Sequence, residues 1–378
     1  MTLQENELIK IRRDLHQIPE IGLEEYETSD YLLKIINGLP QENLEIKRWK
    51  TAILVHLNGE NKNYTIGYRT DIDGLPVEEK TGLPFSSKHE GRMHACGHDI
   101  HMTVALGVLS YFASHRPKYN MTFIFQPAEE NASGGMKLYQ SGELDEWMPD
   151  EIYALHDIPA GTIGCRKGTL FAGTCEIHVK FIGKSGHAAY PHQANDMVVA
   201  GAQFVNQIQT IVSRNVDPIQ SGVVTLGHFS AGTTGNVISC VCQIDGTIRA
   251  LTQENNLLIQ KRVRTIAEGI AHSFDCELEI DLHQGGYYPV ENDDNTTEAF
   301  INYMKNEDDV DFVETLPAMT GEDFGYLISK IPGTMFWLGV DSPYSLHSEY
   351  LAPKEESIML GINAITGYLK NRQESLNK

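Results

Sequence analysis

One eight-residue stretch, His94-Ala-Cys-Gly-His-Asp-Ile-His101, carries one thiol, three imidazoles and one carboxylate. These side chains are ligands of zinc, cobalt, manganese and nickel. Burying so many ionisable groups together costs free energy unless they are paired or hold a metal, so the stretch predicts half of a metal site. The apolar run from residue 100 to 114 predicts a helix, whose N-terminus would favour a thiolate at Cys96. Of His98 and His101, which could share a helix face, we expect only one to bind the metal.

Three more pairs of acidic or imidazole side chains follow short apolar segments that predict buried strands. They are Asp71 and Asp73 after residues 64–68, Glu129 and Glu130 after 121–125, and His156 and Asp157 after 152–155. Open α/β sheets place their sites at the C-terminal ends of strands, so we expect these pairs to meet at one sheet edge. One of the two aspartates is expected to be functional. Adjacent glutamates point in different directions, so one could bind a metal while its neighbour acts as a general base.

The elements that position these residues follow two different patterns of predicted secondary structure. Strands and helices alternate through residues 1–173 and again through 285–378, which predicts one α/β catalytic domain with a mixed, mainly parallel sheet between helices. Residues 174–284 instead alternate apolar and polar side chains in strands near 176–183, 223–229, 237–249 and 277–282, with helices near 196–214 and 252–274. This predicts a smaller inserted α/β sandwich with an open sheet edge. A chain of 378 residues fits two domains.

The composition excludes several classes of partner. The formal net charge is −21 at pH 7 and the pI is about 5.1, so we expect no nucleic acid and no anionic membrane, whereas a small anionic substrate is compatible. The first residues lack the apolar core of a secretory signal, and no apolar run reaches the length of a membrane span. The six scattered cysteines then predict reduced thiols in a cytoplasmic protein.

The series of motifs resembles, from end to end, the dinuclear metallopeptidases that include aminoacylases and glutamate carboxypeptidases, and specifically their amidohydrolase branch of hippurate hydrolases and plant auxin-conjugate hydrolases. The motifs are Arg12-Arg-Asp-Leu-His16, Arg69-Thr-Asp-Ile-Asp73, His94-Ala-Cys-Gly-His-Asp99, Gln126-Pro-Ala-Glu-Glu130, Leu155-His156, Gly186-His-Ala-Ala-Tyr-Pro-His192, Gly321-Glu-Asp-Phe324 and His347. Each alone is weak, but their order is specific. Residues 318–326 and 335–339 are most similar to the N-acetyldiaminopimelate deacetylases of Gram-positive bacteria.

The resemblance implies a metallopeptidase fold whose inserted domain serves as a lid and dimerisation domain, so we expect a homodimer. It also implies two divalent ions (zinc, cobalt, manganese or nickel), and their ligands would be Cys96, His98, Glu130, His156 and His347. Glu129 would be the general base and Asp71 would orient a ligand imidazole. Many relatives carry a ligand histidine where this chain has Arg69, and the Cys96 thiolate would take over that coordination.

The inserted domain contributes three further candidates. In relatives the histidine at the position of His187 stabilises the oxyanion, often from the dimer partner. Asn236 and Arg249 are candidates for holding the substrate's carboxylate, although roles as a turn residue and a strand-end charge fit them equally well.

The expected reaction is hydrolysis of the amide bond of an N-acyl amino acid. The specific expectation is deacetylation of N-acetyl-L,L-2,6-diaminopimelate to L,L-2,6-diaminopimelate and acetate, a step of lysine biosynthesis. Two alternatives stay open: a broader N-acyl-amino-acid amidohydrolase of the aminoacylase or hippurate hydrolase type, or a dipeptidase. A non-catalytic metal-binding protein is a third, and Glu129 argues against it because a structural metal site needs no adjacent base.

Overall fold

The computed structural model describes residues 2–158 and 162–376, and the chain divides into two compact units. Unit 1 consists of Met1–Leu170, Val290–Leu316 and Tyr326–Lys378. Unit 2 consists of Phe171–Pro289 and Pro317–Gly325, so the predicted insertion 174–284 lies within it. Unit 2 also takes in the loop that carries the Gly321-Glu-Asp-Phe324 motif.

Unit 1 is built on an eight-stranded mixed sheet with the strand order β1-β2-β4-β3-β5-β16-β6-β15. The consecutive strands β4, β3, β5 and β16 are parallel to one another, which confirms the predicted fold class. The strands are β1 (Leu44–Trp49), β2 (Ala52–Leu57), β3 (Asn61–Asp71), β4 (Tyr119–Gln126), β5 (Glu151–Ile158), β6 (Ile163–Cys165), β15 (Phe312–Glu314) and β16 (Gly333–Gly339).

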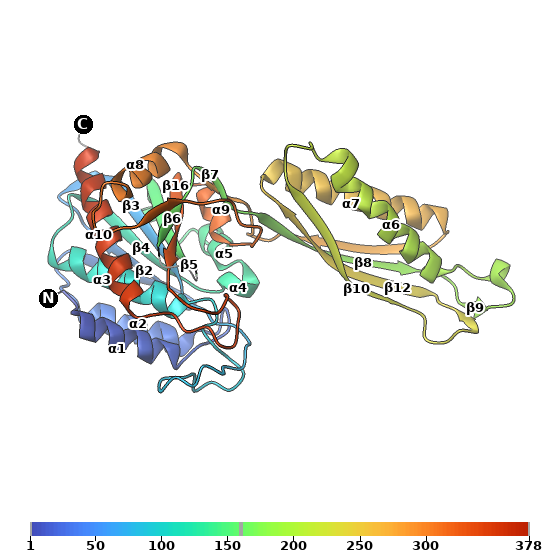
Figure 1. Cartoon of the computed structure of the whole chain (residues 1–378), viewed down its shortest axis with the longest axis horizontal. Coiled ribbons are helices and arrows are strands. Elements are labelled where there is room, and N and C mark those ends of the chain that lie inside the picture. The colour runs from blue at the N-terminus through green and yellow to red at the C-terminus, as the bar shows by residue number, and fades with distance from the viewer. Residues whose placement is uncertain (1, 159–161, 377–378) are drawn as a thin grey trace. The chain divides into compact units, whose positions relative to one another are not determined.

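The helices of unit 1 lie around this sheet (Figure 1), and the five longest described ones bury apolar side chains in a common core with its strands. They are α1 (Glu5–His16), α2 (Tyr26–Asn37), α3 (His98–Ser114), α4 (Glu129–Ala132), α5 (Gly134–Gln140), α8 (Asp294–Met304) and α10 (Glu356–Ser375), with α9 (Phe324–Ile328) at the return from unit 2. In α1, Leu8, Ile11 and Leu15 recur at helical spacing and are buried. Helix α3 is apolar nearly all round because it packs against the sheet strands, α1 and α10.

The parallel strands bring the predicted motifs to one edge. In the β3–β4 register Asp71 pairs with Gln126, so the Asp71–Asp73 and Glu129–Glu130 segments leave the sheet side by side. The neighbouring strand β5 carries His156 near its C-terminal end. As expected for parallel strands, side chains far apart in sequence meet at the same edge.

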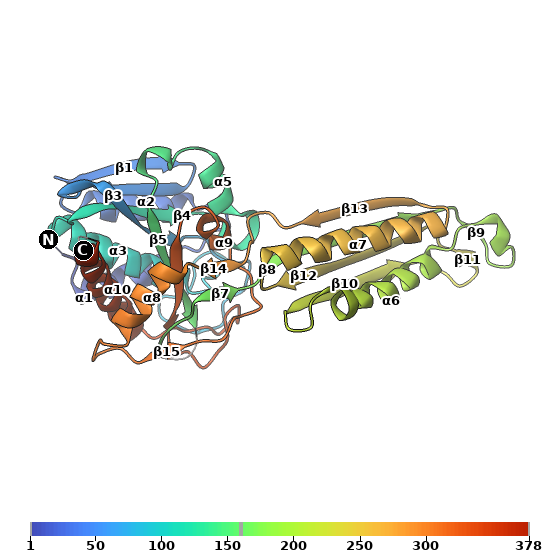
Figure 2. The same ribbon diagram turned by 90° about the horizontal axis from the view of Figure 1, so that it is seen from above.

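Unit 2 has a four-stranded antiparallel sheet of order β10-β12-β8-β13, and α6 and α7 run side by side along it (Figure 2). Side chains of β8 alternate between buried and exposed, because the helices cover one face of the sheet. Its elements are β8 (Gly173–Ile182), β9 (Gly186–His187), α6 (Met197–Asn215), β10 (Gly222–Ala231), β11 (Val237–Ile238), β12 (Val241–Ala250), α7 (Gln253–Ser273) and β13 (Glu277–His283). The chain also contains β7 (Gly168–Phe171) paired with β14 (Val290–Asn292).

The single strand predicted over 237–249 was wrong in one detail, because the structure interrupts it. Ser239 accepts a hydrogen bond from the Val241 amide and donates one to the Val241 carbonyl oxygen, which forms a local turn between β11 and β12. Strand β11 then pairs with β9 instead of continuing into β12. Among the described residues, no helix combines the length and apolar character needed to cross a bilayer.

Candidate metal centre

Cys96 and His98 flank Gly97, the N-cap residue of helix α3, which begins at His98. Gly97, at the N-cap of α3, has φ 84°, a left-handed conformation that glycine adopts without strain. This turn aims the Cys96 thiol at His156, with Sγ 3.5 Å from Nε2. The turn therefore places Cys96 beside the C-terminal end of β5.

Two imidazoles are held in matching orientations. The Nδ1 of His98 donates to the carbonyl oxygen of Asp73 at 2.9 Å, and the Nδ1 of His156 donates to the carbonyl oxygen of Asp157 at 2.9 Å. A carbonyl oxygen can only accept, so both Nδ1 atoms carry the proton and both Nε2 atoms present a lone pair. Fixing the tautomer in this way is typical of metal-binding histidines.

His101 is used differently. Its Nδ1 lies 2.7 Å from Asp71 Oδ1, and its Nε2 accepts the Asp157 amide at 3.0 Å. Both ring nitrogens therefore have protein partners, and the ring supports Asp71 and Asp157. His98 Nε2, in contrast, has no hydrogen-bond partner among the described residues, and that only one of His98 and His101 binds the metal stays a prediction.

Glu129 and Glu130 lie in the four-residue helix α4, between two residues in the left-handed region, Ala128 at φ 55° and Ser133 at φ 52°. Such conformations are strained for residues with a side chain. The Glu130 amide donates to Asp73 Oδ2 at 2.9 Å, so the β3 loop supports the β4 loop. Glu130 Oε1 lies 3.8 Å from His98 Nε2 and 3.7 Å from His347 Nε2.

Four of the groups whose ligand atoms lie within 4.8 Å of one another belong to unit 1. Cys96, His98 and His156 form one group, and Cys96, Glu130 and His347 form another, so the thiol is common to both. His98 also groups with Glu129 and Glu130, and with Asp71 and His101. The structure thus brings together every residue of unit 1 that the sequence proposed as ligand or base.

The electrostatics of the cluster favour a bound cation. Burial, together with the carboxylates of Glu130, Glu129 and Asp71, raises the pKa of the Cys96 thiol well above its usual value. Here these effects outweigh the helix N-terminus, from which the sequence predicted a thiolate. Burial also raises the pKa of Glu130 to about 7. A divalent ion would offset this crowding of negative charge.

Two buried polar atoms of the ligand cluster make no hydrogen bond within the described structure. His98 Nε2 and Glu130 Oε1 are buried and have no hydrogen-bond partner among the described residues. A buried lone pair without a donor is unfavourable, and a metal ion is the partner that this set of sulfur, nitrogen and oxygen atoms suits. The residues therefore fit divalent metal ions.

Asp71 is fully buried beside Arg69, His98 and His101. Burial opposes its ionisation, but His98, His101 and Arg69 hold the pKa of Asp71 well below its usual range. The Nη1 of Arg69 donates to Asp71 Oδ2 at 2.8 Å and its Nε donates to Gln126 at 2.9 Å. The arginine that replaces the histidine of many relatives is thus a buried support for Asp71.

Sequence reasoning missed a second supporting network behind α3. Asp99 forms an ion pair with Arg12, whose Nε lies 2.8 Å from Oδ2, and the same oxygen lies 2.9 Å from His16 Nδ1 in a hydrogen bond; all three side chains are buried. The signal was the motif Arg12-Arg-Asp-Leu-His16, which places both donors on one face of α1. These contacts fix the first turn of α3, next to Cys96 and His98.

The remaining candidates, His187, Asn236 and Arg249, belong to unit 2. His187 lies in β9 opposite Val237, and the Ala188 amide donates to the Asn236 carbonyl oxygen at 3.1 Å, so His187 and Asn236 are neighbours. Arg249 lies near the other end of β12, opposite Thr174 and beside Gly321. Val241 and Arg249 are eight residues apart in β12, a distance of roughly 26 Å along the strand. His187 lies in the separate β9–β11 pair, beyond the Val241 end of β12, so His187 and Arg249 are at opposite ends of unit 2.

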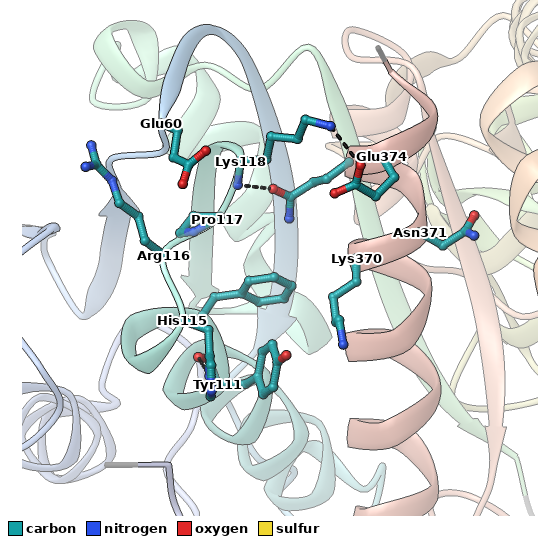
Figure 3. A pocket seen from close by; sticks show the side chains of 11 residues that line it. Glu60, Tyr111, His115, Arg116, Pro117, Lys118, Lys370, Asn371 and Glu374 are labelled. Atoms are coloured by element: carbon teal, nitrogen blue, oxygen red, sulfur yellow. Dashed lines mark hydrogen bonds and ion pairs between the residues drawn. The ribbon is translucent and has the colours of Figure 1, made fainter. Parts of the chain in front are cut away.

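A pocket of about 560 Å³ in unit 1 lies at the C-terminal end of α3, beside α10 (Figure 3). Its charged lining pairs internally, as in the Lys118–Glu374 ion pair at 2.8 Å, while Lys370 lies over the Tyr111 ring. Helix α3 is 17 residues long, so roughly 25 Å separate this pocket from His98. The pocket is therefore distinct from the metal centre.

Comparisons with known proteins agree with this geometry. Residues 67–371 match the profile of Peptidase family M20/M25/M40. The chain is 98% identical over 381 aligned positions to N-acetyldiaminopimelate deacetylase of Ligilactobacillus salivarius, with 100% of both chains covered. It is 68% identical to N-acetyldiaminopimelate deacetylase of Lactiplantibacillus plantarum, over 98% of this chain and 99% of the relative. A Bacillus subtilis protein described as a dinuclear metal-binding peptidase from the M20 family superposes with a TM-score of 0.84 at 29% identity, over 98% of each chain.

Proposed function

The chain belongs to Peptidase family M20/M25/M40, and from that premise we propose that it removes the acetyl group from N-acetyl-L,L-2,6-diaminopimelate, releasing L,L-2,6-diaminopimelate and acetate. The support for the substrate is the pair of full-length relatives that carry this activity in their names. The reaction is an amide hydrolysis, and it belongs to lysine biosynthesis. The enzyme is therefore a metal-dependent amidohydrolase.

One observation carries the metal assignment: His98 and His156 both give their Nδ1 proton to a backbone carbonyl and turn Nε2 toward Cys96, Glu130 or Asp71. We assign Cys96, His98, Glu130, His156 and His347 as ligands. Five ligands in two overlapping groups exceed the four that one tetrahedral ion needs, so the set would hold two divalent ions. Zinc, cobalt, manganese and nickel all suit such a mixed set.

Divalent ions, when bound, would make water a stronger acid and polarise the acyl carbonyl group. Glu129 acts as the general base. It is buried beside His98 and Glu130, and it takes a proton from the attacking water and returns it to the leaving amine. Glu130 differs from its neighbour because its Oε1 faces the two ligand imidazoles of His98 and His347.

Asp71 and His101 support the metal centre without being assigned as ligands. The Asp73 carbonyl orients His98 directly, whereas Asp71 reaches His101 and Arg69, with its Oδ2 3.8 Å from His98 Nε2. We assign Asp71 to holding negative charge beside the ligand imidazole, with Arg69 and His101 keeping the carboxylate ionised and oriented.

The two ends of unit 2 have separate roles. His187 is assigned to stabilising the oxyanion, with Asn236 beside it, and Arg249 to pairing with a substrate carboxylate. Because the length of β12 separates His187 from Arg249, one copy of unit 2 cannot place both on one substrate. A homodimer in which each active site takes His187 from one subunit and Arg249 from the other meets this requirement.

The experiment is an acetate-release assay across N-acyl amino acids with defined added metals. N-acetyl-L,L-2,6-diaminopimelate should be turned over faster than N-acetyl or N-benzoyl amino acids that lack the distal ammonium and carboxylate groups. Comparable rates across the panel would favour a broader amidohydrolase or dipeptidase, and no turnover of any compound would favour a non-catalytic metal-binding protein.

A further inference from the structure

The segment that joins α1 to α2 touches both loops of the metal centre. The Gly74 amide, just after Asp73, donates to the carbonyl oxygen of Glu20 at 2.7 Å. The Ala128 amide, just before Glu129, donates to Glu25 Oε1 at 2.8 Å. The other Glu25 oxygen accepts the Thr51 hydroxyl at 2.6 Å, and the Glu25 side chain has no exposed surface. A buried carboxylate more than a hundred residues away in sequence therefore binds the backbone next to the general base.

Ala128 needs such a partner. It has φ 55° and ψ 45°, a conformation that costs free energy for any residue with a Cβ atom. The surrounding structure must supply the contacts that keep a residue in this region. Two contacts do so, since Glu25 accepts its amide and the Gly134 amide donates to its carbonyl oxygen at 3.0 Å. This turn sets the direction in which Glu129 leaves β4.

Close packing at Gly22 holds the same turn. A Cβ atom added at Gly22 would lie 2.7 Å from Ala128 Cα and 2.8 Å from Ala128 Cβ. The segment between α1 and α2 therefore lies directly on the turn, with no room for a side chain between them. The close packing of Gly22 and the hydrogen bond from the Ala128 amide to Glu25 together restrict the backbone conformation of Ala128.

We propose that Glu25 is a positioning residue for the general base: its carboxylate holds the Ala128 amide and thereby keeps the Glu129 carboxylate in its catalytic position. The inference rests on the proposed role of Glu129 and adds a residue to it. Glu20, on the same segment, has a different task, because its side chain accepts the amides of Glu27 and Thr28 and so caps helix α2.

The test compares Glu25→Ala with Glu25→Gln in the metal-loaded enzyme. Glu25→Ala should lower kcat by about 10- to 100-fold with KM and bound metal nearly unchanged, because small displacements of a catalytic group have effects of this size. Glu25→Gln should retain most of kcat, since its amide oxygen can still accept the Ala128 amide. Thr51→Val, which removes only the hydrogen bond to Glu25, should give a smaller loss.

Glu20→Ala is the matched control, because it removes a buried carboxylate of the same segment whose hydrogen bonds, among the described residues, are to the amides of α2, and it keeps the Glu20 carbonyl that Gly74 contacts. It should lower Tm and leave kcat unchanged. Hydrogen–deuterium exchange gives a readout without turnover: the Ala128 amide should exchange faster in Glu25→Ala than in the wild type, and not in Glu20→Ala.

Three results would overturn the proposal: equal loss of kcat in Glu25→Ala and Glu25→Gln, loss of metal in proportion to kcat, or unchanged exchange at Ala128. The proposed function fails separately, if the wild type does not release acetate from N-acetyl-L,L-2,6-diaminopimelate. In that case the kcat values of the Glu25 variants are compared on whichever N-acyl amino acid the wild type hydrolyses. The hydrogen–deuterium exchange of the Ala128 amide is compared in the same variants.

Discussion

Asp157 lies so close to Gly97 that no side chain fits at position 97. A Cβ atom on Gly97 would lie 2.0 Å from Asp157 Oδ2, and the backbone there has φ 84°. Asp157 is itself fixed, because its amide donates to His101 and its carbonyl oxygen accepts from His156. The glycine thus lets α3 begin within contact of β5, which is what places Cys96 beside His156.

Gly97→Ala should therefore lower both stability and metal content. The left-handed backbone costs about 1–2 kcal/mol for alanine, and the clash with Asp157 adds about 1–3 kcal/mol. Gly82→Ala is the matched control, since Gly82 has φ 70° and no atom within 4 Å of an added Cβ. Chemical denaturation and metal analysis should show a loss of stability in both variants and a loss of metal in Gly97→Ala alone. Equal metal content in the two would contradict the role of the turn.

Substitutions at the adjacent glutamates should have different effects. Glu129→Gln should lower kcat by roughly 10²- to 10⁴-fold with the metal retained, because only proton transfer is lost. Glu130→Gln should release metal, because it replaces an anionic ligand by a neutral amide. The measurement is kcat together with the metal content of each purified variant. Turnover that survives Glu129→Ala would contradict the assigned base.

Removal of the metals should destabilise the fold as well as stop turnover. The buried thiol and carboxylates around His98 are left without a cation, and burial raises the pKa of Cys96 and Glu130 in that state. A ligand at 100 times its Kd stabilises the folded state by about 2.7 kcal/mol, so Tm should fall on chelation and rise again as metal is added back. Cys96→Ser should shift the metal dependence of Tm to higher concentration. An unchanged Tm on chelation would contradict the metal assignment.

The placement of His187 and Arg249 at opposite ends of unit 2 predicts complementation between inactive subunits. His187→Ala lacks the oxyanion donor and Glu129→Ala lacks the base. If His187 acts on the partner's site, mixed dimers of the two variants contain one complete site. Refolding an equal mixture should restore roughly a quarter of the wild-type activity, since half of randomly formed dimers are mixed. No recovery, or a monomer by light scattering, would refute the shared site.

The contact between His178 and Asp245, on the exposed face of the unit 2 sheet, should depend on pH. His178 and Asp245 are paired in the β8–β12 register, with Nδ1 2.9 Å from Oδ1. The hydrogen bond to Asp245, assisted by Glu176, raises the pKa of His178 above its ordinary value of 6.5. The stabilisation is therefore fully present below about pH 6.5 and is lost as the pH rises through the raised pKa.

Asp245→Asn should return the pKa of His178 toward 6.5, measured by NMR titration of the imidazole. Asp281→Asn is the control, because Asp281 is the register partner of His178 on the other side, in β13, and no hydrogen bond joins them in the described structure. A His178 pKa that moves in Asp281→Asn and not in Asp245→Asn would contradict this pairing.

The sequence alone was sufficient for the local part of the site. Apolar runs ending in Asp71, Gln126 and His156 predicted parallel strands, and parallel strands with short connections bring their C-terminal ends together. The acidic and imidazole pairs at the strand ends could be identified in this way, whereas the ligand set, His347 included, followed from the resemblance of the ordered motifs to a known family. The break between β11 and β12 was not predicted, since a β-branched run conceals the Ser239 turn.

Only the tertiary structure decided the roles of residues that act through space. His98 and His101 are equivalent by spacing, and the choice between them depends on which acceptor meets each Nδ1, the Asp73 carbonyl or the Asp71 carboxylate. Glu25 has no motif of its own, because its partner Ala128 is a backbone amide 103 residues away. His187 and Arg249 were assigned to one domain from sequence, and their separation follows from strand register. Hydrogen-bond direction and register depend on three-dimensional contacts, which periodicity and composition do not encode.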